Sequence, residues 1–154
     1  MSLTVEDKFL IQELAIKYNH AVDSGDAEAF AALFTEDAVF REGHGDDLHI
    51  INEVGRENIL RATHAAMKNF RPGIFRHTTT SHLIWEQDGR VYGESYNLLV
   101  STRQSIHSSS RYVDEYRKVD GRWLFSKRRA YCDGSKEAWQ ASMRKMFEAA
   151  AEPA

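Results

Sequence analysis

The spacing of hydrophobic residues changes near residue 74. Before that point, apolar side chains recur every three or four positions, which is typical of one buried face of a helix. Beyond it, apolar and polar residues alternate, as they do in strands that bury one face. The first half therefore predicts helices over residues 4–24, 27–34 and 55–69, a short strand over 38–41 and a polar, glycine-containing loop over 42–52.

The second half predicts a meander of long antiparallel strands joined by glycine-containing turns. A further helix is expected over residues 134–151. Helices followed by consecutive strands indicate an α+β fold. Strands of this length are expected to curl into a curved antiparallel sheet that wraps around the N-terminal helices and leaves an internal pocket, in one domain over residues 1–154. The strands are expected over 74–86, 90–102, 106–119 and 122–132, and the last helix shows an apolar face of Trp139, Met143, Met146 and Phe147.

Composition excludes several classes of protein. The net charge is −3 with both signs spread along the chain, so we expect neither a nucleic-acid partner nor an anionic membrane surface. No apolar run approaches the roughly 20 residues that span a bilayer, and no apolar signal segment follows the first residue. We therefore expect a cytoplasmic protein. The single cysteine, Cys132, excludes an internal disulfide and a cysteine-rich zinc site.

Asp23 and His77 are the first candidates for chemistry. Asp23 falls in the last turn of the first predicted helix, where the negative end of the helix dipole disfavours a carboxylate unless a partner compensates. His77 lies on a predicted strand and shares a face with Phe75 and Trp85 by strict alternation. A carboxylate that contacts an imidazole in an apolar cavity is a general base. The alternatives are a histidine satisfied by a hydroxyl group and a carboxylate that only helps to form a turn.

Tyr18 and Arg128 are the next candidates. Tyr18 lies on the buried stripe of the first helix, and its hydroxyl group could reach the same cavity, although five residues turn a helix by about 140° and separate it from the face of Asp23. Strict alternation on the last strand points Arg129 inward, whereas one β-bulge would point Arg128 inward instead. An inward arginine could hold an anion.

A metal site is not expected. His44 and His49 share the predicted loop with Asp46 and Asp47, but their spacing does not match that of known metal ligands. The chain also has no phosphate-binding glycine loop and no dinucleotide fingerprint. We therefore expect chemistry without a metal or cofactor.

The motifs around these candidates resemble the SnoaL-like family of the nuclear transport factor 2-like superfamily, over nearly the whole chain. That resemblance implies a cone-shaped fold in which a curved sheet wraps around helices. The motifs are Ile11-x2-Leu14-x3-Tyr18-x2-Ala21-x-Asp23-x-Gly25-Asp26, Leu33-Phe34-Thr35-Glu36-Asp37-Ala38, Arg76-His77 and Asp120-Gly121-Arg122-Trp123 leading to Arg128.

Within the superfamily, the Asp-then-His pair is similar to that of scytalone dehydratase, bile-acid 7α-dehydratase and hexachlorocyclohexane dehydrochlorinase. The resemblance to the dehydrochlorinase implies that Arg128, rather than Arg129, belongs to the site. Tyr18 matches a catalytic tyrosine of the bile-acid enzyme. Phe40 and Ser101 stand where scytalone dehydratase has a substrate-binding tyrosine and a second histidine. With Trp85, they are the expected substrate-binding residues.

The first hypothesis is a cofactor-independent lyase, a dehydratase or dehydrohalogenase, acting on a small, apolar, cyclic substrate. His77 would remove a proton, Asp23 would hold its tautomer, Tyr18 would donate a hydrogen bond and Arg128 would stabilise the departing anion. An isomerase or cyclase would use the same proton abstraction.

Two rival hypotheses remain open. One is a non-catalytic ligand-binding or assembly subunit, similar to the small subunits of ring-hydroxylating dioxygenases. The other is an epoxide hydrolase in which Asp23 and either Asp114 or Glu115 flank Arg128. The partners expected are a small-molecule substrate and other copies of the chain, as a dimer or trimer, because an open curved sheet leaves an outer face to cover.

Overall fold

The computed structural model of the protein describes residues 2–45, 47–68, 72–101, 106–141 and 144. It confirms the α+β fold with a curved, mostly antiparallel sheet. The helices and strands are α1 (Val5–Ser24), α2 (Ala27–Ala31), β1 (Phe34–His44), β2 (Asp47–Val54), α3 (Arg56–Met67), β3 (Phe75–Gln87), β4 (Arg90–Ser101), β5 (Ile106–Val119) and β6 (Arg122–Cys132).

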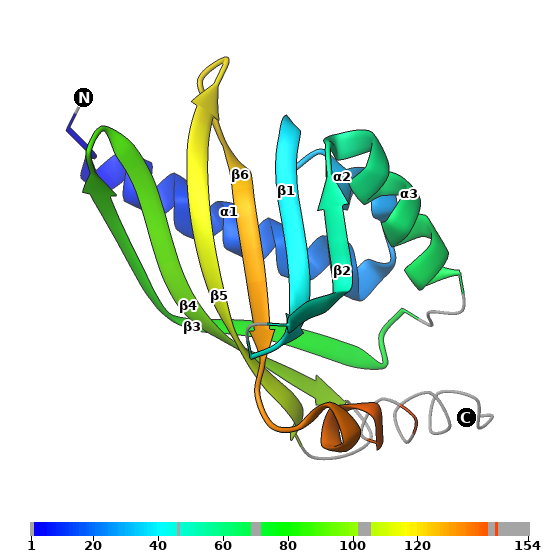
Figure 1. Cartoon of the computed structure of the whole chain (residues 1–154). Coiled ribbons are helices and arrows are strands. Elements are labelled where there is room, and N and C mark those ends of the chain that lie inside the picture. Colours follow the sequence, from blue (N-terminus) through cyan, green and yellow to red (C-terminus); the bar gives the residue numbers. More distant parts are fainter. Residues whose placement is uncertain (1, 46, 69–71, 102–105, 142–143, 145–154) are drawn as a thin grey trace.

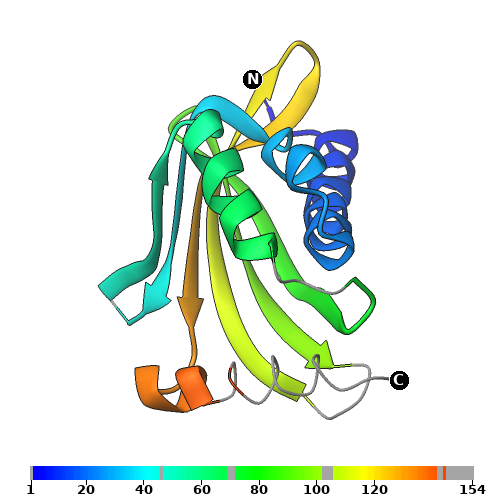
Figure 2. The ribbon, with the colours of Figure 1, turned by 90° about the vertical axis from the view of Figure 1, so that its right-hand side faces the viewer.

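The six strands form one sheet in the order β2-β1-β6-β5-β4-β3. Neighbouring strands are antiparallel except for β1 and β6, which run parallel. Figure 1 shows α1 crossing the sheet on one side, and Figure 2 shows α3 on that same side, with the strands bent around both helices. The side chains that face the helices therefore line the interior of the fold.

Local sequence explains where the first helices begin and end. Thr4 caps α1 by accepting a hydrogen bond from the Asp7 backbone N–H at 3.0 Å, while the Asp7 carboxylate accepts one from the Thr4 backbone N–H at 3.2 Å. Gly25 ends the helix with φ of 73°, a left-handed conformation that glycine adopts without steric cost. Asp26 then caps α2 by accepting from the Ala29 N–H.

Two expectations about the helices and strands were wrong, and a third falls partly outside the described residues. The second helix ends at Ala31, because Phe34 already pairs with Phe125 across the parallel β1–β6 ladder. Residues 42–52 are not a loop: β1 continues to His44 and β2 pairs with it at the edge of the sheet, where polar residues can face solvent. Residues 136–141 are helical, as expected, but Met143, Met146 and Phe147 lie outside the described residues.

A cluster of aromatic rings joins α1 and α2 to the sheet. The ring of Tyr18 packs against those of Phe30 and Phe125, with centroids 4.8 and 5.8 Å apart, and Phe34 and Phe40 continue the cluster. All five side chains are buried. Such tilted and edge-on ring pairs stabilise a fold beyond the area that they bury, so this cluster fixes α1, and with it Tyr18, against the strands.

Two β-bulges exchange the faces of their strands. Ser81 on β3 has φ of 52°, and the pairing with β4 shifts between Thr80 and Leu83. On β6, Lys127 pairs with Glu115 and Phe125 with Tyr116, so Ser126 has no pairing partner. Each bulge adds one residue to one strand only, and every side chain beyond it points to the face opposite to that expected from strict alternation.

Among the described residues, no helix is both long enough and apolar enough to cross a lipid bilayer.

Asp7 ties the start of α1 to the β5–β6 hairpin, so replacing it should destabilise the fold. Its carboxylate accepts hydrogen bonds from Lys118 at 2.9 Å and from the Trp123 indole at 2.8 Å. We expect Asp7→Ala to lower the free energy of unfolding by about 2 kcal/mol, because a helix cap is lost and a partly buried indole N–H loses its acceptor. Urea denaturation measures this, and Glu6→Ala, at an exposed acid of the same turn, should change it by less than about 0.5 kcal/mol.

The same variant should change how stability depends on pH. The hydrogen bonds from Lys118, Thr4 and Trp123 hold the pKa of the Asp7 carboxyl well below its usual range. This stabilisation is therefore present above the unfolded pKa of about 3.9 and is lost as the pH falls toward the lower folded value. Wild type should lose more stability than Asp7→Ala on acidification below that value. Parallel pH profiles for the two proteins would contradict the role of Asp7.

Candidate active site

A cavity of about 500 Å³ lies between the helices and the inner face of the sheet. This volume is in the range of small-molecule sites. Its walls come from α1, α2, α3 and all six strands, and most of the lining residues are apolar. The apolar part includes Val22, Phe30, Phe40, Ile51, Met67, Phe75 and Leu99, and the polar part includes Tyr18, Glu42, Glu53, His77, Asn97, Ser108, Ser109, Ser110 and Tyr112.

The structure places Asp23 and His77 in direct contact. His77 Nδ1 lies 2.7 Å from Asp23 Oδ1, and the His77 backbone N–H donates to both carboxylate oxygens at 3.1 Å. One helical turn earlier, Asn19 bonds Thr79, which lies two residues beyond His77 on β3. Two side-chain contacts, Asn19 with Thr79 and Asp23 with His77, therefore join α1 to β3. Together they fix the position of the carboxylate relative to the imidazole.

This geometry determines how the imidazole can act. A carboxylate only accepts hydrogen bonds, so a contact with Asp23 requires the proton of His77 to reside on Nδ1. In the neutral form of the imidazole, the other nitrogen, Nε2, then carries the lone pair, and no described residue bonds it. His77 lines the cavity, whereas Asp23 lies behind it. The pair thus presents a basic nitrogen to whatever occupies the cavity.

The Tyr18 side chain forms part of the cavity wall. It is buried, and burial raises the pKa of the phenol to about 12, an effect that the charge of Arg128 partly offsets. The hydroxyl group therefore remains protonated at neutral pH and can donate a hydrogen bond. Tyr18 lines the cavity and Asp23 does not, although Asp23 contacts His77, which does.

Arg128 points inward, because the bulge at Ser126 reverses the alternation that would have favoured Arg129. Its guanidinium group is 0% exposed and donates to both oxygens of Asp114, through Nε at 2.9 Å and through one terminal nitrogen at 2.7 Å. The rings of Tyr18, Tyr112 and Phe125 lie 4.0–4.3 Å from the guanidinium carbon. Such contacts between a cation and aromatic faces are favourable.

The role expected for Arg128 does not agree with this position. Arg128 is not among the residues that line the cavity, since the rings of Tyr18 and Tyr112 lie between. Its charge is already neutralised by Asp114, so it is not available to stabilise a departing anion directly. The epoxide-hydrolase arrangement is formed only in part. Asp114 pairs with Arg128, as that hypothesis expects of one acid, but Asp23 bonds His77 instead, and Glu115 forms an ion pair with Lys127.

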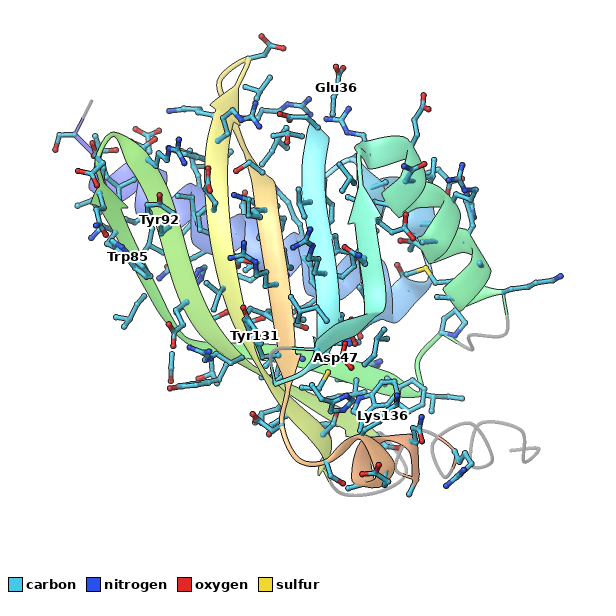
Figure 3. All side chains as sticks on the ribbon, in the orientation of Figure 1. Glu36, Asp47, Trp85, Tyr92, Tyr131 and Lys136 are labelled. Atoms are coloured by element: carbon cyan, nitrogen blue, oxygen red, sulfur yellow. The ribbon has the colours of Figure 1, made fainter. Side chains whose placement is uncertain are left out.

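The three expected substrate-binding residues have different positions. Phe40 lines the cavity. Trp85 does not, because the bulge at Ser81 turns it to the outer face of the sheet, where it stacks on Tyr92 with ring centroids 6.0 Å apart (Figure 3). Ser101 is buried opposite Phe75 on the neighbouring strand and is not among the cavity-lining residues.

Sequence analysis missed most of the polar residues of the cavity, including Glu42 and Asn97. Glu42 lies on β1 two positions after Phe40, so both side chains face inward, but the segment was expected to be a loop. Asn97 lies on β4, is 3% exposed, and its Oδ1 has no hydrogen-bonding partner among the described residues. Alternation from the predicted strand could have identified Asn97, since it shares a face with Leu99.

A second inward histidine belongs to the Arg128 network. The bulge at Ser81 turns His82 inward, where its Nε2 lies 3.0 Å from the Tyr116 hydroxyl group, and that hydroxyl group donates to Asp114 at 2.9 Å. Gly93 makes room for this contact, because a Cβ atom there would lie 2.7 Å from the hydroxyl oxygen. Burial lowers the pKa of His82, which favours its neutral form.

No group of three or more histidine, cysteine, aspartate or glutamate side chains in the described part of the chain is arranged to hold a metal ion. Asp46 and the side chain of His49, which were considered as ligands, lie outside the described residues.

Comparisons with known proteins agree with this fold. A family model described as a SnoaL-like domain matches residues 4–129. A protein with a cystatin-like fold from Nostoc punctiforme is 26% identical, with a TM-score of 0.75 over 88% of this chain and 97% of that one. LinA is 24% identical, with a TM-score of 0.70 over 84% of this chain and 88% of its own, and this likeness shows the fold alone. No curated protein matches the chain.

Breaking the buried ion pair should be costly. We expect Asp114→Asn to lower the free energy of unfolding by about 3–5 kcal/mol, because the Arg128 guanidinium group stays buried without a compensating charge. The double variant Asp114→Leu with Arg128→Met should recover much of this loss, since it removes both charges. Chemical denaturation of the three proteins measures the difference. If Asp114→Asn were as stable as wild type, the ion pair would not be needed to stabilise the fold beside the cavity.

Proposed function

We propose that this chain, which belongs to the SnoaL-like domain family, is an enzyme that removes a proton from carbon in a small, mostly apolar substrate and eliminates a leaving group. The observation that carries the proposal is the 2.7 Å contact between Asp23 and His77, whose imidazole lies on the wall of an apolar cavity. The resemblance to dehydratases and a dehydrochlorinase supports the same reaction class.

The proposed steps follow from the positions of the side chains. Nε2 of His77 accepts the proton from carbon, and Asp23 stabilises the imidazolium that forms. A positioned general base of this kind contributes about 10²–10⁴-fold to the rate. Tyr18 donates a hydrogen bond to an oxygen of the substrate, which withdraws electron density as the carbanion character develops. These interactions gain strength in a cavity that excludes water.

The lining also indicates the charge of the substrate. None of the cavity-lining residues that the structure describes is lysine or arginine, whereas Glu42 and Glu53 both contribute carboxyl groups. An anionic substrate would lack a counter-charge and would meet these carboxyl groups in a region of low dielectric constant. A neutral substrate of one or two rings fits the polarity and the volume of the cavity.

A non-catalytic binding subunit is less well supported by the same geometry. In such a subunit, we would expect His77 to bond only hydroxyl groups and Asp23 to face solvent. Instead, the Asp23 side chain is 14% exposed and accepts hydrogen bonds from the ring and the backbone of His77. An isomerase would share the first proton abstraction, and the products of a turnover experiment distinguish it from a lyase.

The base can be tested without knowing the natural substrate. 5-Nitrobenzisoxazole is a neutral bicyclic compound whose five-membered ring opens when a base removes the proton from C3, the carbon next to the ring nitrogen. We expect wild type to accelerate this opening, and His77→Ala to lower kcat/KM by about 10²-fold or more. Asp23→Asn should also lower it, because the amide no longer fixes the proton on Nδ1. The measurement is the absorbance of the released nitrophenolate.

His64→Ala is the matched control, since this histidine is exposed on α3 and its partner is the exposed Glu28. It should leave the rate unchanged. ¹⁵N NMR of His77 should show the proton on Nδ1 in wild type and a mixture of tautomers in Asp23→Asn. Equal rates for wild type and His77→Ala, or a wild-type proton on Nε2, would overturn the proposed base.

A further inference from the structure

Glu42 places a carboxyl group inside the cavity, on the wall formed by β1. It pairs with Ile51 of β2 on one side and with Ala130 of β6 on the other, and all three residues line the cavity. In the sheet order, β1 is separated from β3 by three strands, so Glu42 and His77 belong to different walls. The curvature of the sheet nevertheless brings both side chains to the same cavity.

The surroundings of Glu42 favour the protonated acid. Its one hydrogen-bonding partner among the described residues is the Cys132 thiol, whose sulfur lies 3.8 Å from Oε1, and no described lysine or arginine forms an ion pair with it. Tyr18 from α1 and Tyr112 from β5 line the same cavity, and burial raises the pKa of both phenols, so both remain neutral. Burial raises the pKa of the Glu42 carboxyl, while a charged His77 would lower it.

We propose that Glu42 is the proton donor of this site and that it protonates an oxygen atom leaving the substrate. The inference rests on the proposed function. His77 Nε2 takes the proton from carbon, the electron pair of that C–H bond forms the new double bond, and the bond from the neighbouring atom to oxygen breaks. The leaving oxygen takes the proton of Glu42. The neutral acid and neutral imidazole thus become a carboxylate and an imidazolium.

The charges of this step are balanced within the cavity. His77 gains a positive charge as Glu42 gains a negative one. The resulting imidazolium and carboxylate attract each other in a region of low dielectric constant. A proton passed from the imidazolium to the carboxylate, through water that enters as product leaves, restores both groups. The step selects substrates whose leaving group is a basic oxygen, such as a hydroxyl group, over those that lose a halide, because a halide ion needs no proton.

The test uses benzisoxazoles whose leaving phenols differ in acidity. With Glu42→Gln, we expect kcat/KM to fall by about 10²-fold for unsubstituted benzisoxazole, whose phenolate is basic, and by less than about tenfold for the 5-nitro compound. The dependence of the rate on the acidity of the leaving phenol should therefore be steeper in the variant. Glu36→Gln is the matched control, since Glu36 lies at the exposed end of the same strand (Figure 3), and it should follow wild type.

A second measurement does not depend on turnover. In protein labelled with ¹³C at the glutamate side-chain carboxyl carbon, the Glu42 signal should remain that of an acid over the pH range in which exposed glutamates, with pKa values of about 4.3, have ionised. Its loss in Glu42→Gln assigns the signal. Ionisation together with the exposed glutamates, or an equal loss of rate for all leaving groups, would overturn the role of Glu42. Failure of every benzisoxazole in wild type would overturn the base instead, while the NMR result would still decide the state of Glu42.

Discussion

The buried ion pair between Arg128 and Asp114 is the constraint on which the interior depends. Removing two charges from water is costly, and hydrogen bonds within the pair and to neighbouring groups offset part of that cost. Asp114 accepts two hydrogen bonds from the guanidinium group and one from the Tyr116 hydroxyl group. The rings of Tyr18 and Tyr112 cover the guanidinium face and also line the cavity. Because the pair holds these rings in place, it defines the floor on which a substrate would lie.

The curvature of the sheet gives the cavity two chemically different walls. β3 brings His77 against the end of α1, where the Asp23 carboxylate bonds Nδ1 and fixes the orientation of the imidazole. β1 brings Glu42 in among apolar and neutral side chains, where ionisation is disfavoured. A flat sheet with the same strand order would keep these two residues far apart. The fold therefore holds His77 and Glu42 on different walls of one cavity.

Sequence patterns predicted the fold better than they predicted the faces of the strands. The bounds of β5 and β6 agree with the expected ones because glycine turns and a clear period of two mark them. The bulges at Ser81 and Ser126 could not be foreseen from that period, which is why Trp85 was expected in the cavity; only the family resemblance pointed to Arg128. Glu42 was missed because polar residues of an edge hairpin resemble those of a loop.

The contact between Asp23 and the backbone of His77 has a consequence beyond the chemistry of the imidazole. β3 is the last strand of its sheet, so backbone groups on its outer side have no neighbouring strand. The His77 N–H is one such group, and the carboxylate at the end of α1 accepts its hydrogen bond. A strand from another molecule cannot pair with a group that is already occupied. Asp23 thus also shields an open edge against strand addition, the route by which exposed edges lead to aggregation.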